Sequence, residues 1–291
     1  MRNVTKALHA IIAALVEVAM TRPSWPNDAR CAVTLTFDNF GEALDLYKHG
    51  HAAGALADGV YATRRGVHRI LDMLDRHGIK GTFFVEGWGA AKYADLLREV
   101  ATRGHEVGGH GWLHEDWGDL KKKAQRGLIA RTTGAIGDAL GRPPRGWRSP
   151  GGLMTPHTLD LLRDAGYLYD SSFADEDVPY LFENGLVELP WTWALDDAPF
   201  YGTSRAITRP SVLAGMWMEE FDAALDLTGS FMVVCHPRFS GRPAHAKALE
   251  SVVAHAEGRE GVWFARCDEV AAHVAASEGT PRYPEPAVRD T

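Results

Sequence analysis

The chain has 291 residues, 45% of them hydrophobic, and its 31 basic and 38 acidic residues leave a net charge of -7. That length and composition allow one domain with a large buried core. The charge is spread along the sequence and the one basic run is residues 121–123, which excludes the concentrated cationic face of a nucleic-acid-binding protein.

The first 22 residues predict a helical extension ahead of the main domain. Apolar residues such as Leu8, Ile11 and Leu15 recur there at spacings of three and four, the period of an amphipathic helix. Glu17 interrupts the apolar run, and the run is too short to span a bilayer, so no membrane association is expected. An export signal is the alternative interpretation of this segment.

The three cysteines of the chain, Cys31, Cys235 and Cys267, cannot all form disulfides with one another. Two of them lie inside apolar runs, where a reduced thiol packs as a small hydrophobic side chain. This usage favours a reducing compartment, and we expect a cytoplasmic protein.

Strand-like apolar runs alternate with segments of helical period along the rest of the chain. The predicted strands are residues 31–37, 81–85, 105–109, 146–148, 167–170, 186–193, 230–235 and 261–266. The predicted helices include residues 67–74, 93–100 and 155–162, with Thr155 as the N-cap of the third and Gly78, Gly104 and Gly166 as C-terminal caps. This alternation predicts an α/β fold in which outer helices close a parallel sheet into a barrel, as one domain over residues 23–291.

Residues 41–59 interrupt the alternation. They are rich in Gly, Ala and His, and they directly follow the first predicted strand. Because long irregular segments in compact domains are usually functional or mobile, we predict a loop or lid here.

Chemically reactive side chains gather just beyond the predicted strands. In a parallel barrel the C-terminal ends of the strands meet at one rim, where the active site lies. The residues at these ends are Asp38, His110, His114, Arg148, Asp170 and His236. The sequence therefore predicts an enzyme.

His110 and His114 are four positions apart, a spacing that can aim two imidazoles at one point. Neutral imidazole is a frequent ligand of zinc-like ions. Two histidines that merely cap a loop are the alternative. A third ligand would come from the end of the first strand, where Asp38 and Asn39 offer oxygen donors.

Residues at the strand ends could also support acid and base catalysis. Asp38 would lie at the barrel mouth and could accept a proton from water. Arg148 could hold the Asp38 carboxylate, and His236 could protonate a leaving amine. The alternatives are a strand-end cap for Asp38, a surface position for Arg148 and a satisfied core histidine for His236.

At these residues the chain resembles the polysaccharide deacetylase superfamily, also called the NodB homology or carbohydrate esterase 4 group. The similar motifs are Thr-Phe-Asp-Asn at 36–39, His-x3-His at 110–114, Arg-x-Pro-x-Gly at 148–152 and the final histidine motif at 233–237. The resemblance implies a distorted (β/α)7 barrel that hydrolyses amides with the help of a divalent metal. It also implies a role for each residue: Asp38 as base, His236 as acid, Arg148 as the residue that orients the base, and His110 and His114 as metal ligands.

One position departs from the superfamily pattern. The second Asp of the first motif, a metal ligand in the superfamily, is Asn39 here. An amide oxygen binds a divalent cation more weakly than a carboxylate, so Asn39 would be a weak third ligand of a zinc ion. Glu42 is the nearest replacement donor, and Asp38 itself could change from base to ligand.

The middle of the chain resembles an intracellular branch of the superfamily that includes cyclic imide hydrolases and metal-independent allantoinases. The similar segments are residues 169–173, 177–180, 188–190, 193–199, 216–222, 236–238 and 241–243. Within them we expect Asp196, Asp197 and Arg238 to contact the substrate.

Tryptophans also lie in or beside the loops that follow the predicted strands. Trp88, Trp112 and Trp191 are predicted to line the substrate pocket with their aromatic faces. Stacking on sugar rings and simple packing at the barrel rim are the alternatives.

Together these features predict a hydrolase of non-peptide carbon–nitrogen bonds that acts on a small linear or cyclic amide. A deacetylase of N-acetyl glycans, of the chitin or peptidoglycan type, is the first alternative. The second is a catalytically inactive barrel that binds carbohydrate, with Asn39 marking the loss of the metal. The expected partner is a small amide or amino-sugar substrate, and a homo-oligomer is expected only because two-fold symmetric enzymes are common.

Overall fold

The computed structural model describes residues 22–202 and 208–286. The predicted N-terminal helical extension, residues 1–22, lies outside the described residues except for Arg22. Within the described ranges, every helix is too short or too polar to cross a bilayer.

A single ten-stranded sheet runs through the described residues. Its strands are β1 (Cys31–Asp38), β2 (Thr82–Val85), β3 (Glu106–Gly109), β4 (Gly146–Trp147), β5 (Tyr169–Asp170), β6 (Tyr180–Phe182), β7 (Val187–Glu188), β8 (Ser230–Cys235), β9 (Val262–Phe264) and β10 (Arg282–Tyr283).

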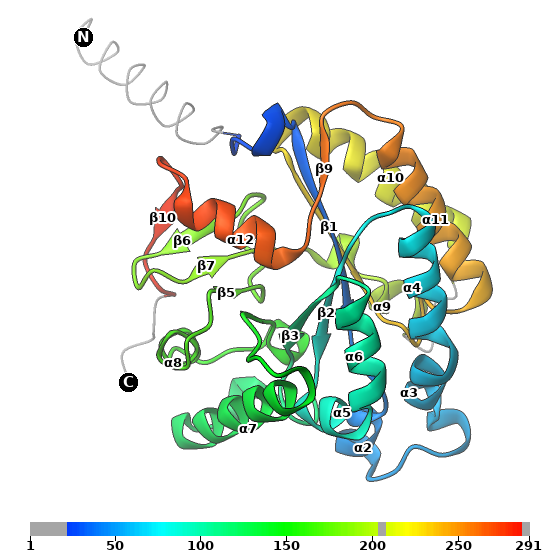
Figure 1. The fold of residues 1–291 in the computed structure, drawn as a ribbon, viewed down its shortest axis with the longest axis vertical. Coiled ribbons are helices and arrows are strands. Elements are labelled where there is room, and N and C mark those ends of the chain that lie inside the picture. The colour runs from blue at the N-terminus through cyan, green and yellow to red at the C-terminus, as the bar shows by residue number, and fades with distance from the viewer. Residues whose placement is uncertain (1–21, 203–207, 287–291) are drawn as a thin grey trace, which may run out of the picture.

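Helices surround this sheet, and α4, α10 and α11 lie along one flank of it (Figure 1). The helices are α2 (Ala43–His49), α3 (Asp58–Tyr61), α4 (Val67–Arg76), α5 (Gly87–Lys92), α6 (Ala94–Thr102), α7 (Lys122–Leu140), α8 (Thr158–Asp164), α9 (Ala198–Tyr201), α10 (Pro210–Leu227), α11 (Pro243–Glu257) and α12 (Cys267–Ala276).

The sheet is curled and almost entirely parallel. Its strand order is β10-β6-β7-β5-β4-β3-β2-β1-β8, β9 also pairs with β1, and only β6 and β7 are antiparallel. Within the described residues β7 and β8 share no ladder, and an isolated parallel bridge joins Asp196 to Val234 on the open side of β8. This arrangement confirms the predicted distorted α/β barrel and its single domain.

The alternation of side chains along β1 explains how polar groups reach the barrel interior. The odd-numbered residues from Cys31 to Phe37 belong to the apolar core that α4 and α10 cover. Side chains alternate between the two faces of a strand, so Thr36 and Asp38 lie on the opposite, inner face. The period of β1 therefore delivers Asp38 to the inside of the barrel at the end of the strand.

Several predicted boundaries differ from the structure. The predicted strand at 186–193 is shortened to β7, and Pro190 explains part of this because proline has no N–H to donate to a ladder. β6 and β10 are not predicted, because segments of two or three residues carry no usable alternation. Gly78, Gly104 and Gly166 do follow their helices in the left-handed conformation, at φ of 65°, 90° and 86°.

The predicted N-cap Thr155 is wrong. Helix α8 begins at Thr158 with His157 as its N-cap residue. The Thr155 hydroxyl accepts a hydrogen bond from Nε2 of Gln125 at 2.7 Å and a longer one from the backbone N–H of His157 at 3.4 Å. Thr155 therefore stabilises the turn that precedes α8 and contacts α7.

The predicted long loop at residues 41–59 is also wrong, because the segment contains α2 and the start of α3. Helix α2 ends at Gly50, whose φ is 72°. Asp45 of α2 is buried and forms an ion pair with Arg238, which lies far away in the sequence. This contact fixes the segment against the barrel.

Candidate active site

A cavity of about 560 Å³ lies at the C-terminal ends of the central strands. It collects predicted site residues from across the whole chain. Those that line it are Asp38, Asn39, His110, His114, Arg148, Trp191, Asp196, His236 and Arg238. Asp170 does not line the cavity: it is buried and accepts hydrogen bonds from the hydroxyl and the backbone N–H of Ser172.

Arg148 holds the Asp38 carboxylate in a fixed orientation. Nη1 of Arg148 lies 3.1 Å from Oδ1 and 3.3 Å from Oδ2 of Asp38, and 2.8 Å from Oγ1 of Thr36. Nε and Nη2 donate to the carbonyl oxygen and the hydroxyl of Ser171 at 2.9 and 2.8 Å. Both Asp38 and Arg148 are almost fully buried, so neither the guanidinium nor the carboxylate is free to turn.

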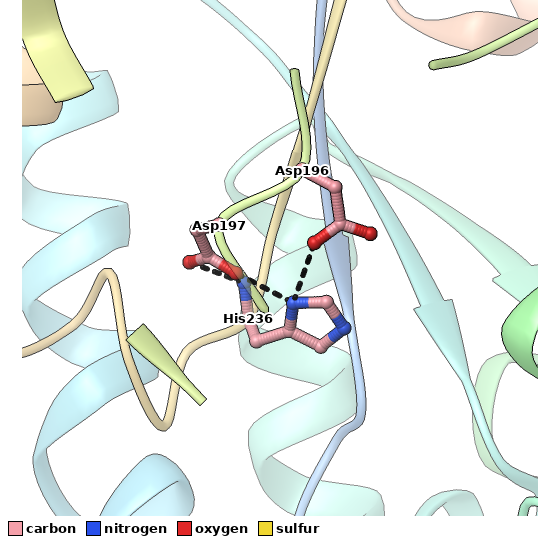
Figure 2. A group of neighbouring side chains, drawn as sticks. All are labelled: Asp196, Asp197 and His236. Carbon is pink, nitrogen blue, oxygen red and sulfur yellow. Dashed lines mark hydrogen bonds and ion pairs between the residues drawn. The ribbon is translucent and has the colours of Figure 1, made fainter. Parts of the chain in front are cut away.

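His236 is paired with two carboxylates (Figure 2). Its Nδ1 lies 2.6 Å from Oδ1 of Asp197 and 3.7 Å from Oδ1 of Asp196. Burial by itself would lower the pKa of His236, but the negative charges of Asp197, Asp196 and Asp38 raise it to about 9. The imidazole is therefore protonated at neutral pH, and its second ring nitrogen points away from both carboxylates (Figure 2). An imidazole in this state can donate a proton.

The hydrogen bonds of Asp197 fix the position of the His236 ring. Besides the ring nitrogen, Asp197 accepts hydrogen bonds from the backbone N–H of His236 and from the hydroxyl of Ser240. Asp197 is fully buried and does not line the cavity, so the structure places it behind His236 and not at the cavity wall where a substrate contact was predicted. Nothing in a single sequence links Asp197 to a histidine 39 positions away.

His110 and His114 are held as neutral imidazoles. Nδ1 of His110 donates to the carbonyl oxygen of Arg148 at 2.7 Å, which leaves Nε2 with a free lone pair. Burial lowers the pKa of His110 to about 3 and holds that of His114 well below its usual value. The two ring centroids are 5.0 Å apart, and Gly111 and His114 have φ of 73° and 66° in the turn that brings the rings together.

The chain is similar to a known protein family and to solved structures. The family model of the polysaccharide deacetylases matches residues 27–169. A crystal structure from Mycobacterium smegmatis assigned to the polysaccharide deacetylases is 34% identical, with a TM-score of 0.85 over 94% of this chain and 99% of that one. The chain belongs to the polysaccharide deacetylase family.

The chain is also similar to two other proteins. The peptidoglycan deacetylase of Helicobacter pylori is 25% identical over 252 residues, which are 74% of this chain and 86% of the relative. The structure of the PuuE allantoinase is 23% identical, with a TM-score of 0.81 over 90% of this chain and 95% of that one. The allantoinase likeness shows a shared fold alone.

Asn39, His110 and His114, which line the cavity, are side chains suited to binding a divalent cation. Oδ1 of Asn39 is buried and has no hydrogen-bond partner among the described residues, and φ of Asn39 is 62°. An orphaned acceptor that lines the same cavity as two neutral imidazoles, His110 and His114, is what a cation of the zinc type would satisfy. Glu42, the other predicted donor, does not line the cavity, and its carboxylate accepts a hydrogen bond from Tyr93, whose hydroxyl oxygen lies 2.7 and 2.6 Å from the two carboxylate oxygens.

A second group of possible ligands is Asp196, Asp197 and His236, whose donor atoms lie within 4.8 Å of one another. These atoms already bond to one another and to backbone N–H groups, including that of Ala198, which donates to Asp196 at 2.7 Å. A cation here would have to break the pairing that protonates His236. We therefore interpret this group as a proton-transfer unit.

The predicted substrate contacts divide into two sets. Trp191, Asp196 and Arg238 line the cavity, whereas Trp88 and Trp112 do not. Trp88 packs edge-on against Tyr93, and Trp112 lies under the guanidinium of Arg131 at 3.5 Å. These two tryptophans pack against side chains outside the cavity.

Helix α2 provides a wall of the cavity that the sequence did not predict. Leu44, Asp45, Lys48 and His49 of this helix line the cavity. Arg238 donates from Nη1 to Asp45 at 2.9 Å and from Nη2 to the carbonyl oxygen of Gly41 at 3.2 Å. A helix of seven residues is too short for its periodicity to be recognised, so the sequence pattern does not predict α2.

Proposed function

We propose that the protein hydrolyses the carbon–nitrogen bond of a small linear or cyclic amide. The observation that carries this proposal is that a fixed carboxylate, Asp38, and a protonated imidazole, His236, line the same cavity. A base and an acid on one cavity are what addition of water to an amide and release of an amine require.

In the proposed reaction Asp38 takes a proton from the water molecule whose oxygen attacks the amide carbon. Arg148 keeps the Asp38 carboxylate in place during this step. The free ring nitrogen of His236 then gives a proton to the amide nitrogen as the carbon–nitrogen bond of the tetrahedral intermediate breaks. The products are a carboxylate and an amine, and in a cyclic substrate both remain in one molecule.

His110, His114 and Asn39 would hold a divalent cation, for which zinc is our expectation. When bound, such an ion polarises the carbonyl and lowers the pKa of water. His110 serves this site because the Arg148 carbonyl fixes its tautomer.

The size of the cavity supports a small substrate. Its volume of about 560 Å³ is within the range of pockets that enclose small molecules. The cysteines Cys31, Cys235 and Cys267 are free and buried, which supports our placement of the protein in the cytoplasm.

Deacetylation of N-acetyl glycans is the second candidate function, which the likeness to the H. pylori peptidoglycan deacetylase favours. An inactive barrel that binds carbohydrate is the third. The test is ring opening of a panel of imides and ureides, run beside acetate release from chito-oligomers. Activity is assayed as purified, after chelation, and after return of zinc.

Ring opening or hydrolysis of small amides supports the proposal. Acetate release from chito-oligomers alone would overturn it in favour of the glycan deacetylase. Sugar binding without turnover under every metal condition would overturn the proposal in favour of the inactive, carbohydrate-binding barrel.

A further inference from the structure

A second cavity, of about 540 Å³, opens beside the catalytic cavity. We call it the side pocket and define it by Leu153, Met154, Pro156, Leu159, Phe173 and Ala174. Gly151, Gly152, Trp191 and Trp193 line both cavities, so the two adjoin each other at these residues. A substrate in the catalytic cavity that also reached the side pocket would have to pass the two indoles.

The side pocket leaves apolar side chains open to water. Trp193 is 53% exposed and Leu153 is 47% exposed, which is unusual for such large apolar groups. The rings of Trp191 and Trp193 meet edge to face with centroids 4.6 Å apart. Exposed apolar surface inside a concave site marks a place where an apolar group gains free energy by binding.

The two hydroxyl groups at this pocket already have hydrogen-bond partners, whereas Nε1 of Trp191 is buried and has none among the described residues. The Ser172 hydroxyl donates to Asp170 at 2.9 Å and accepts from the backbone N–H of Ser149 at 2.8 Å. The Thr155 hydroxyl accepts from Gln125. A sugar placed here would find neither hydroxyl free to pair with its own hydroxyls, which disfavours a glycan as the occupant.

We infer that the side pocket binds an alkyl or aryl substituent of the amide substrate. This inference rests on the proposed function and narrows it: the substrate is an amide or ring amide that carries a bulky apolar arm beside the scissile bond. The arm passes Trp191 and Trp193 and rests against Leu153 and Phe173.

The test compares two pairs of compounds, 5-benzylhydantoin with hydantoin and N-benzylacetamide with N-methylacetamide. For each, kcat/KM is measured by hydrolysis and the affinity by calorimetry. Ala174→Phe fills the side pocket from a solvent-exposed position, and Leu153→Ser makes its wall polar. Matched controls are Ala254→Phe and Val212→Ser, which change exposed residues that line neither cavity.

We expect the wild type to prefer the benzyl compound of at least one pair by tenfold or more in kcat/KM and in affinity. Ala174→Phe and Leu153→Ser should each lower that ratio at least fivefold, whereas the controls should keep it. Hydrolysis of both members at equal kcat/KM, or a ratio that Ala174→Phe leaves unchanged, would overturn the inference while the proposed function stands.

Failure of the proposed function has a different signature. If no compound is hydrolysed but the benzyl compounds still bind more tightly and lose this advantage in Ala174→Phe, the side pocket is supported and the chemistry is wrong. Tighter binding of chito-oligomers that Ala174→Phe abolishes would assign the side pocket to a sugar and overturn the inference.

Discussion

Nδ1 of His110 lies 2.7 Å from the carbonyl oxygen of Arg148, so one residue orients two parts of the site. The Arg148 side chain holds the candidate base Asp38, and its backbone fixes the tautomer of the candidate ligand His110. The two effects can be separated by substitution, because only the first depends on the guanidinium.

Arg148→Met should lower kcat at least about a hundredfold, because Asp38 loses the group that positions it. It also leaves a buried carboxylate unpaired, which should destabilise the fold by about 3–5 kcal/mol. The zinc content should stay at the wild-type level, because the backbone carbonyl that orients His110 remains. Kinetics, denaturant titration and elemental analysis measure the three effects, and a wild-type kcat in the folded variant contradicts the assignment.

Asp38→Asn and His236→Ala should each lower turnover by at least about a hundredfold, the scale for removal of a general base or acid. Asn keeps the shape of Asp38 but cannot accept the proton, and Ala removes the donor ring. Steady-state rates with a substrate found in the amide panel check this, with circular dichroism to confirm folding. Turnover at the wild-type rate in both variants removes these roles.

Turnover should fall as pH rises through about 9, because His236 must be protonated to donate and carboxylates hold its pKa at about 9. Asp197→Asn should move this fall at least one pH unit lower, because the nearest negative charge is lost. The pH dependence of kcat measures both. An alkaline limb that stays in place in Asp197→Asn argues against His236 as the acid.

The same pairing should contribute to stability with a defined sign. The folded-state pKa of His236 is raised from 6.5, so its contribution is complete below about pH 6.5 and is lost as pH rises through about 9. Asp197→Asn should therefore destabilise the protein at pH 6 more than at pH 10. Denaturant titrations at the two pH values test this, and equal losses would argue against the raised pKa.

Asn39→Asp should bind zinc at least about tenfold more tightly than the wild type, because a carboxylate replaces a neutral amide as the third donor. Asp tolerates the left-handed backbone at this position, so the exchange adds little strain. Calorimetry with zinc measures the change. Asn184→Asp, at the turn between β6 and β7, is the control for added negative charge, and an equal gain there would refute a local effect.

Asp45→Ala should destabilise the protein by about 3–5 kcal/mol, because it leaves the buried Arg238 guanidinium without its partner. The double substitution Asp45→Leu with Arg238→Met should recover most of the loss, since it removes both charges. Denaturant unfolding of both variants gives the comparison. A loss below about 1 kcal/mol in Asp45→Ala would show that this pair does not hold α2 in place.

Much of the fold follows from local patterns in the sequence. Alternation in β1 and the glycines after α4, α6 and α8 mark elements that the structure contains, because strand period and left-handed caps are local properties. The rim position of Asp38, His110, Arg148 and His236 follows from parallel strands with C-terminal ends at one edge.

Other features arise only from contacts between distant segments. α2, β6 and β10 are too short to carry a period, and α2 is held by Asp45 pairing with Arg238. The resemblance singled out Asp197, but its pairing with His236 has no signal in the sequence, because that pairing depends on a histidine that the fold brings beside it.

The sequence by itself therefore determined which residues reach the rim, since that depends on order along the chain and on strand period. Only the tertiary structure decided their protonation and partners. The pKa of His236 depends on carboxylates from a different segment, and the tautomer of His110 depends on a carbonyl 38 positions away. Burial and long-range pairing set those properties, and both exist only once the chain has folded.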